Sequence, residues 1–72
     1  MSSNISKSNI AQNIKRLRQK KGISQDRLSK LADLSLNTVV NIETGNNLNP
    51  TIETIERIAK ALEISINELL KR

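Results

Sequence analysis

Aliphatic residues recur at helical spacing along the chain, and residues that start or stop helices separate the segments. Ile10, Ile14 and Leu17 fall at i, i+4 and i+7, which is the spacing of one helix face. Asn9 can cap this helix together with Gln12, three residues later, as a capping box. No stretch alternates polar and apolar residues as a half-buried strand does, so we expect an all-α chain.

Four further helices are expected, with the predicted N-caps Ser24, Ser35, Thr51 and Ser65. Gly22 and Gly45 are the expected left-handed ends of the first and third helices, and ADLS at residues 32–35 breaks the second. Glu68 lies three residues after Ser65, which predicts a second capping box ahead of a short fifth helix. The expected architecture is a compact five-helix bundle.

Composition limits both the core and the chemistry of the chain. None of the 72 residues is Phe, Tyr, Trp, Cys or His, so the core must consist of Leu, Ile, Val and Ala. Imidazole and thiolate ligands are absent, so we expect no metal and no cofactor, and the lack of aromatic side chains removes the usual means of stacking on single-stranded RNA. No small-molecule ligand is expected, because we expect no second domain for sensing one. One domain at residues 9–71 is expected, behind a flexible tail at residues 1–8. No apolar run nears the roughly 20 residues of a membrane span, so the expected location is the cytoplasm.

Basic residues are concentrated in the first half of the sequence. Residues 1–36 contain eight Lys and Arg and two Asp, a formal charge of +6, whereas residues 37–72 have a formal charge of −1. A basic half suggests a polyanionic partner. Small domains also carry such charges without any nucleic-acid role, so charge alone does not decide the function.

The segment LSLNTVVNIETG, residues 34–45, predicts a helix with an unusual outer face. Val39 and Ile42 lie on one side. The other side carries no charge and consists of Leu36, Asn37, Val40, Asn41 and Thr44. Solvated helix faces usually carry Lys and Glu, whereas Asn can bond adenine N6 and N7 and aliphatic groups can touch thymine methyls in the major groove. This face therefore suits base edges, with A·T steps favoured; the alternative is an ordinary surface or a protein contact.

Four pieces of sequence carry a resemblance to a known family. In order they are LRQKKGISQDRLS (17–29), VNIETG (40–45), NPTIETIERIAKAL (49–62) and ISINELL (64–70). Over about residues 9–70 the chain resembles the Cro and phage-repressor (XRE-like) helix-turn-helix family of DNA-binding domains. The resemblance implies a lambda-repressor-like fold in which the helix at about residues 36–43 enters the major groove.

The resemblance also implies roles for single positions. The implied base-reading residues are Leu36, Asn37, Val40 and Asn41. The expected phosphate contacts are Gln25, Ser35, Thr44 and Arg18, together with Lys15 for its charge and Asn46 for its amide. Arg18 and Glu43 match a family salt bridge between the first helix and the end of the third, for which the planar guanidinium is suited. The simpler alternatives are a solvated Gln25, a Ser35 that only caps, and unpaired surface charges.

Several positions depart from the family pattern. Asp33 replaces the usual Gly in the bend, and we expect it to adopt the left-handed region, which Asp tolerates better than most residues. Ser29 replaces the usual Ala, so its hydroxyl needs a partner. Glu63 replaces the usual Gly after the fourth helix. The loop GNNLNP at residues 45–50 lacks the Lys or Arg that many relatives direct at phosphates.

The predicted function is sequence-specific binding of double-stranded DNA as a transcriptional regulator, on a pseudo-palindromic operator. A homodimer is expected through aliphatic residues on or near the fifth helix, namely Ile64, Ile66, Leu69 and Leu70, with the loop at residues 45–50 as a further candidate for the interface. The alternatives are that these residues fill the monomer core, or that the fold serves as an antitoxin-type protein-interaction module. Catalysis is not expected, because a short helical chain without His or Cys offers little concavity for an active site. A membrane role is not expected either.

Overall fold

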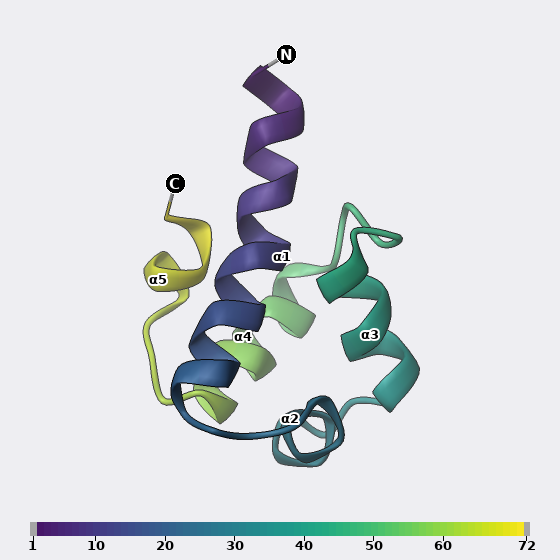
Figure 1. Cartoon of the computed structure of the whole chain (residues 1–72), viewed down its shortest axis with the longest axis vertical. Coiled ribbons are helices and arrows are strands. Elements are labelled where there is room, and N and C mark those ends of the chain that lie inside the picture. Colours follow the sequence, from purple (N-terminus) through teal and green to yellow (C-terminus); the bar gives the residue numbers. More distant parts are fainter. Residues whose placement is uncertain (1, 72) are drawn as a thin grey trace.

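The computed structural model describes residues 2–71, and the side chains of residues 9–71, as five helices without a strand in that range (Figure 1). The helices are Ser2–Lys20 (α1), Gln25–Ala32 (α2), Leu36–Thr44 (α3), Ile52–Ala61 (α4) and Ile66–Leu70 (α5). Helix α3 packs on α1 and α2, α4 packs on α2 and α5, and α5 packs on α1. The all-α prediction is confirmed for the described part of the chain.

Helix α1 begins earlier than the sequence pattern predicts. It starts at Ser2, so Asn9 lies inside the helix and the predicted capping box at Asn9 is wrong. No Gly or Pro stands between the two positions, so nothing in the backbone chemistry forces a helix start at Asn9. Figure 1 shows the first turns of α1 extending beyond the other helices. The flexibility expected for residues 1–8 stays a prediction.

Four helices are followed, within two residues of their last residue, by a residue in the left-handed region. These residues are Gly22, Asp33, Gly45 and Glu63, with φ of 71°, 57°, 85° and 60°. The backbone N–H groups after α2 and α4 return to carbonyls of the last turn, as in Schellman motifs, with Leu34 N bonded to Ser29 O at 2.8 Å and Ile64 N to Ala59 O at 3.0 Å. The sharp ends let five short helices fold back on one another.

Side chains cap three of the predicted helix starts. The hydroxyls of Ser24, Ser35 and Thr51 accept from the backbone N–H three residues later at 3.0, 3.0 and 3.1 Å. Ser65 occupies the N-cap position of α5 but makes no side-chain capping bond. The predicted second capping box is therefore wrong, and the Glu68 carboxylate lies 3.3 Å from Lys71 Nζ instead.

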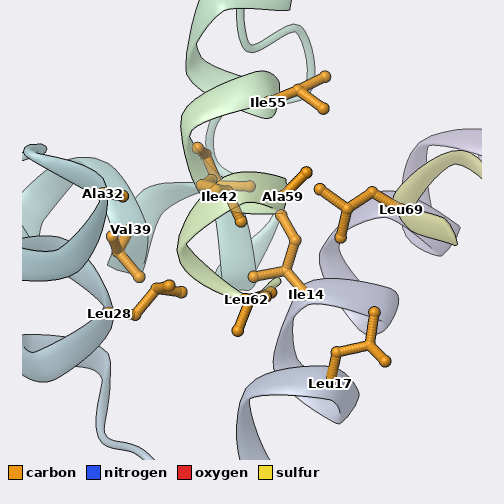
Figure 2. Packing of buried hydrophobic residues seen from close by; sticks show 11 residues of the cluster. Ile14, Leu17, Leu28, Ala32, Val39, Ile42, Ile55, Ala59, Leu62 and Leu69 are labelled. Atoms are coloured by element: carbon orange, nitrogen blue, oxygen red, sulfur yellow. The ribbon is translucent and has the colours of Figure 1, made fainter. Parts of the chain in front are cut away.

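The core is purely aliphatic and receives side chains from all five helices (Figure 2). Its buried members are Ile14, Leu17, Leu28, Ala32, Val39, Ile42, Ile55, Ile58, Ala59, Leu62 and Leu69. Figure 2 shows the side chains of α1, α4 and α5 converging on one interior. Leu69 is 0% exposed, so its predicted place in a dimer interface is wrong: it fills the monomer core. Short helices can bury their apolar faces only by sharing one core in this way.

Candidate nucleic-acid interface

Helix α3 has one buried and one accessible side, as its sequence predicts. Val39 and Ile42 are buried against the rest of the bundle. On the opposite side Leu36 is 43% exposed, Asn37 and Thr44 are exposed, and Val40 and Asn41 are half-buried. The accessible side therefore offers carboxamides, a hydroxyl and methyl groups, and no charge. We call these five residues, Leu36, Asn37, Val40, Asn41 and Thr44, the α3 face.

A tight bend at residues 33–35 joins α2 to α3, and the two helices pack against each other. Asp33 has φ 57° and ψ 46°, the left-handed conformation expected for it. Arg57 of α4 donates to the Asp33 carbonyl at 3.1 Å and to its carboxylate at 3.3 Å. A cation on the carbonyl at the end of α2 suits the negative end of the helix dipole. Arg57 thus ties the bend to α4.

Ser29 lies buried between the helices, and its hydroxyl has a partner. Its Oγ donates to the Asp26 carbonyl at 2.6 Å, one turn earlier in α2. This local bond satisfies the hydroxyl, so Ser is tolerated in place of the usual Ala. Among the described side chains, no buried nitrogen or oxygen lacks a partner.

Glu43 is the centre of a network that joins α1, α2 and the end of α3. Arg18 binds its carboxylate in a bidentate manner, with Nε to Oε2 at 2.7 Å and Nη2 to Oε1 at 3.1 Å. Gln25 Nε2 also donates to Glu43 Oε1, at 3.1 Å. The side chains of Arg18 and Glu43 are only 11% and 2% exposed. Charge-assisted bonds in such a sheltered place hold α3 at a fixed angle to α1 and α2.

The same network removes Arg18 from the set of predicted phosphate contacts. Besides Glu43, its guanidinium donates from Nη1 to the Ile23 carbonyl at 2.8 Å. The Arg18 side chain is only 11% exposed and its guanidinium is held on two sides, so it offers little surface to a nucleic-acid backbone. Arg18 is therefore a structural residue in this fold, a role that the local sequence alone did not separate from phosphate binding.

The N-terminus of α3 is capped within the chain. Ser35 Oγ accepts from Thr38 N at 3.0 Å, and the two hydroxyl oxygens lie 2.8 Å apart. The hydroxyl of Ser35 is thus already engaged. What this end offers an anion is its remaining first-turn N–H groups and the positive end of the helix dipole.

The loop after α3 presents amides close to the α3 face. Asn47 N donates to the Asn41 carbonyl at 3.0 Å, and Thr44 Oγ1 donates to the same carbonyl at 3.3 Å. Asn47 Oδ1 accepts from Asn49 N at 3.1 Å, so this amide stabilises the loop itself. Asn46 is exposed. The predicted contact Lys15 is exposed as well, on α1.

The remaining predicted dimer residues differ in exposure. Ile64 and Ile66 are partly buried and pack against the core, whereas Leu70 is 45% exposed. Because Leu69 is buried, the exposed aliphatic surface of α5 is smaller than the sequence predicts. One face of this five-residue helix already packs against the core of the monomer.

The tertiary contacts of Arg57 and Asn13 could not be predicted from the sequence. Arg57 reaches Asp33 across 24 positions, and the Asn13 side chain on α1 reaches two carbonyls at the end of the chain. Asn13 lies outside the four motif pieces, and Arg57 lies within the piece at residues 49–62, but no local pattern points to the partner of either residue. Only the packing of α1 on α5 and of α2 on α4 brings these groups together.

The described residues contain no acidic cluster suited to a metal ion and no helix long and apolar enough to cross a bilayer. An open groove of about 490 Å³ lies between α2 and α4, and its rim includes Asp33 and Glu63. Their side chains are 97% and 84% exposed. Carboxylates this well hydrated do not have the sheltered surroundings of a general acid or base.

The comparisons with known proteins agree with this geometry. A model of the helix-turn-helix family HTH_3 matches residues 14–69. The HTH-type transcriptional regulator SinR of Bacillus subtilis is 33% identical over 61 residues, which are 85% of this chain and 55% of SinR, so the chain spans about half the length of that relative.

Two solved structures extend the likeness over most of the chain. The restriction-modification controller protein C.AhdI from Aeromonas hydrophila has a TM-score of 0.83 and 33% identity, with 88% of this chain and 94% of C.AhdI covered. The hypothetical transcription factor NHTF from Neisseria has a TM-score of 0.87 and 29% identity, with 92% of this chain and 75% of NHTF covered.

Proposed function

The chain belongs to the HTH_3 helix-turn-helix family, and from this premise we propose that it is a transcriptional regulator that binds specific double-stranded DNA. In this proposal α3 lies in the major groove. The observation that carries the proposal is the α3 face, which is accessible and uncharged and is held rigidly by a buried back and by the Glu43 network.

We propose that Leu36, Asn37, Val40 and Asn41 read base edges. A carboxamide can bond adenine N6 and N7 together, and the aliphatic side chains can contact thymine methyls. The face therefore favours sites that contain A·T pairs. An unmatched charge buried against base edges would be costly, which accounts for the lack of Lys and Glu on this side of α3.

Phosphate contacts are proposed around the two ends of α3. Gln25 Nε2 has two hydrogens, and its bond to Glu43 uses one, so the second is free to donate to a phosphate while the amide is held in place. The N-terminus of α3 at Ser35 offers N–H groups to an anion. Thr44, Asn46 and Lys15 are the remaining proposed contacts, and all three are exposed.

We further propose that the protein binds as a homodimer on a pseudo-palindromic operator, with half-sites one helical turn, about 34–36 Å, apart. The proposed interface is formed by Ile66 and Leu70 of α5 and by Ile64, which precedes the helix, without Leu69. Support comes from the Leu70 side chain, a large aliphatic group that is 45% exposed.

The test is a selection of preferred duplexes from a random library, followed by titrations of wild type, N37A/N41A and the control Q12A. Gln12 is exposed on α1, outside the α3 face. We expect wild type and Q12A to prefer the selected site about 10³-fold or more over random DNA. N37A/N41A is expected to lose about 10-fold or more of that preference, because each bidentate amide contributes ~1–3 kcal/mol of discrimination.

Retained specificity in N37A/N41A would remove the base-reading role from these amides. If wild type selects no site at any salt concentration, the regulator proposal fails. The antitoxin-type protein-interaction module would then be the better account of the fold.

A further inference from the structure

Helix α5 depends on the rest of the chain for its position. It has five residues, too few to be stable alone, and its N-cap Ser65 makes no side-chain capping bond. Its end is followed directly by extended backbone at Lys71. The carbonyls of its last turn therefore have no helical partners and need donors from elsewhere.

Asn13 of α1 supplies a donor to one carbonyl of the last turn and a second donor to the carbonyl of Lys71, which follows the helix. Its Nδ2 donates to the Leu69 carbonyl at 3.0 Å and to the Lys71 carbonyl at 2.6 Å. The amide oxygen of Asn13 accepts from Arg16 Nη2 at 3.2 Å, so both ends of the carboxamide are engaged. We call these two bonds to the Leu69 and Lys71 carbonyls the Asn13 clasp. They join residues 56 and 58 positions apart, across the packed α1 and α5.

The Asn13 clasp and the core together fix the rotation of α5 about its own axis. The Leu69 side chain is buried in the core, and the Leu69 carbonyl accepts a hydrogen bond from Asn13 Nδ2. Leu70, the next residue, is then directed outward and is 45% exposed. Since side chains on a helix keep fixed angles to one another, a change in the rotation of α5 would move Leu70.

We propose that Asn13 is a positioning residue for assembly: it holds α5 in the orientation that presents Leu70 to a second copy of the chain. The inference rests on the proposed dimer through α5. Asn13 itself touches neither the α3 face nor any proposed DNA contact, so its effect on DNA binding passes through the dimer.

The experiment compares wild type, N13A, N13D and the control Q12A. N13D keeps the size and the oxygen that faces Arg16 but replaces the two donors by an acceptor. Amide hydrogen exchange of residues 66–71 and of α2 and α3 is measured by NMR at neutral pH, and the dimer dissociation constant by sedimentation equilibrium. A second control, R16A, keeps both donors of Asn13.

We expect exchange in residues 66–71 to be about tenfold faster in N13A and N13D, with α2 and α3 unchanged. We expect their dimers to dissociate about tenfold more readily, and Q12A and R16A to behave as wild type. If Asn13 only fills space, N13D should have the exchange rates and the dimer dissociation constant of wild type, and that result would overturn the proposal. Wild-type dimer dissociation constants in both N13A and N13D would overturn it as well. A wild-type chain that is monomeric at high micromolar concentration would instead refute the proposed dimer, while the exchange data still test the clasp.

Discussion

The α2–α3 unit and the C-terminal helix α5 are held in the fold by different means. In α2–α3, capping hydroxyls and a left-handed bend act within a few residues, and a sheltered charge network adds bonds across 18 and 25 positions. Helix α5 lacks a side-chain N-cap and is held by Leu69 in the core and by the distant Asn13. Local caps thus start both helices of the proposed DNA-binding unit, and long-range bonds of Arg18, Gln25 and Arg57 then fix its place in the fold. The proposed assembly unit has no side-chain cap at its start and depends on long-range contacts.

The largest expected effect is loss of the charge network behind α3. E43A leaves the sheltered Arg18 guanidinium without its carboxylate and should lower the free energy of unfolding by about 3–5 kcal/mol. Thermal and urea unfolding followed by circular dichroism would measure it. The matched control is E53A, which removes an exposed partner of Arg57 and should cost less than about 1 kcal/mol. Equal effects of the two would mean that the network does not stabilise α3.

Adjacent leucines on α5 should differ in their effect on the monomer. L69A opens a cavity in the core and should cost about 2–5 kcal/mol, whereas L70A removes an exposed side chain and should change stability by less than about 0.5 kcal/mol. Urea unfolding at a concentration where the protein is monomeric separates the two. Similar losses for both would place Leu70 in the monomer core as well.

Two serines in equivalent N-cap positions provide a smaller contrast. Ser35 accepts a bond from the Thr38 backbone, and Ser65 makes none. S35A should therefore cost about 1 kcal/mol and S65A only a few tenths. Midpoints of thermal unfolding measure the difference, and a cost for S65A as large as that for S35A would contradict the description of α5.

The smallest expected effects are gains at the two non-glycine left-handed residues. Glu63 adopts a positive φ, which strains the backbone of a residue with a long side chain more than that of Asp, whose short side chain can bond locally. E63G should therefore stabilise the protein by up to about 1 kcal/mol. The D33G variant should gain less stability, because Asp already tolerates this conformation and because the variant loses the contact between the Asp33 carboxylate and Arg57. Calorimetry would detect either change. A larger gain from D33G would show that the helix-turn-helix bend is the more strained of the two.

Much of the α3 face was predictable, because a nine-residue helix with clear caps and a period of 3.6 fixes which residues share a side. Val39 and Ile42 are buried, and Leu36 and Asn37 are accessible, as that period requires. The role of Arg18 was not fully predictable. A salt bridge and a phosphate contact use the same guanidinium, and only burial decides between them.

The number of helices, three of their side-chain caps and the lack of charge on the α3 face could be predicted from the sequence, because these features depend on bonds and periodicity within a few residues. The burial of Leu69 and Arg18, the exposure of Leu70, and the bonds of Asn13 and Arg57 to distant carbonyls follow from the packing of the helices. These outcomes depend on how helices pack. Packing is set by the summed burial of one shared core, which no single segment of the sequence encodes.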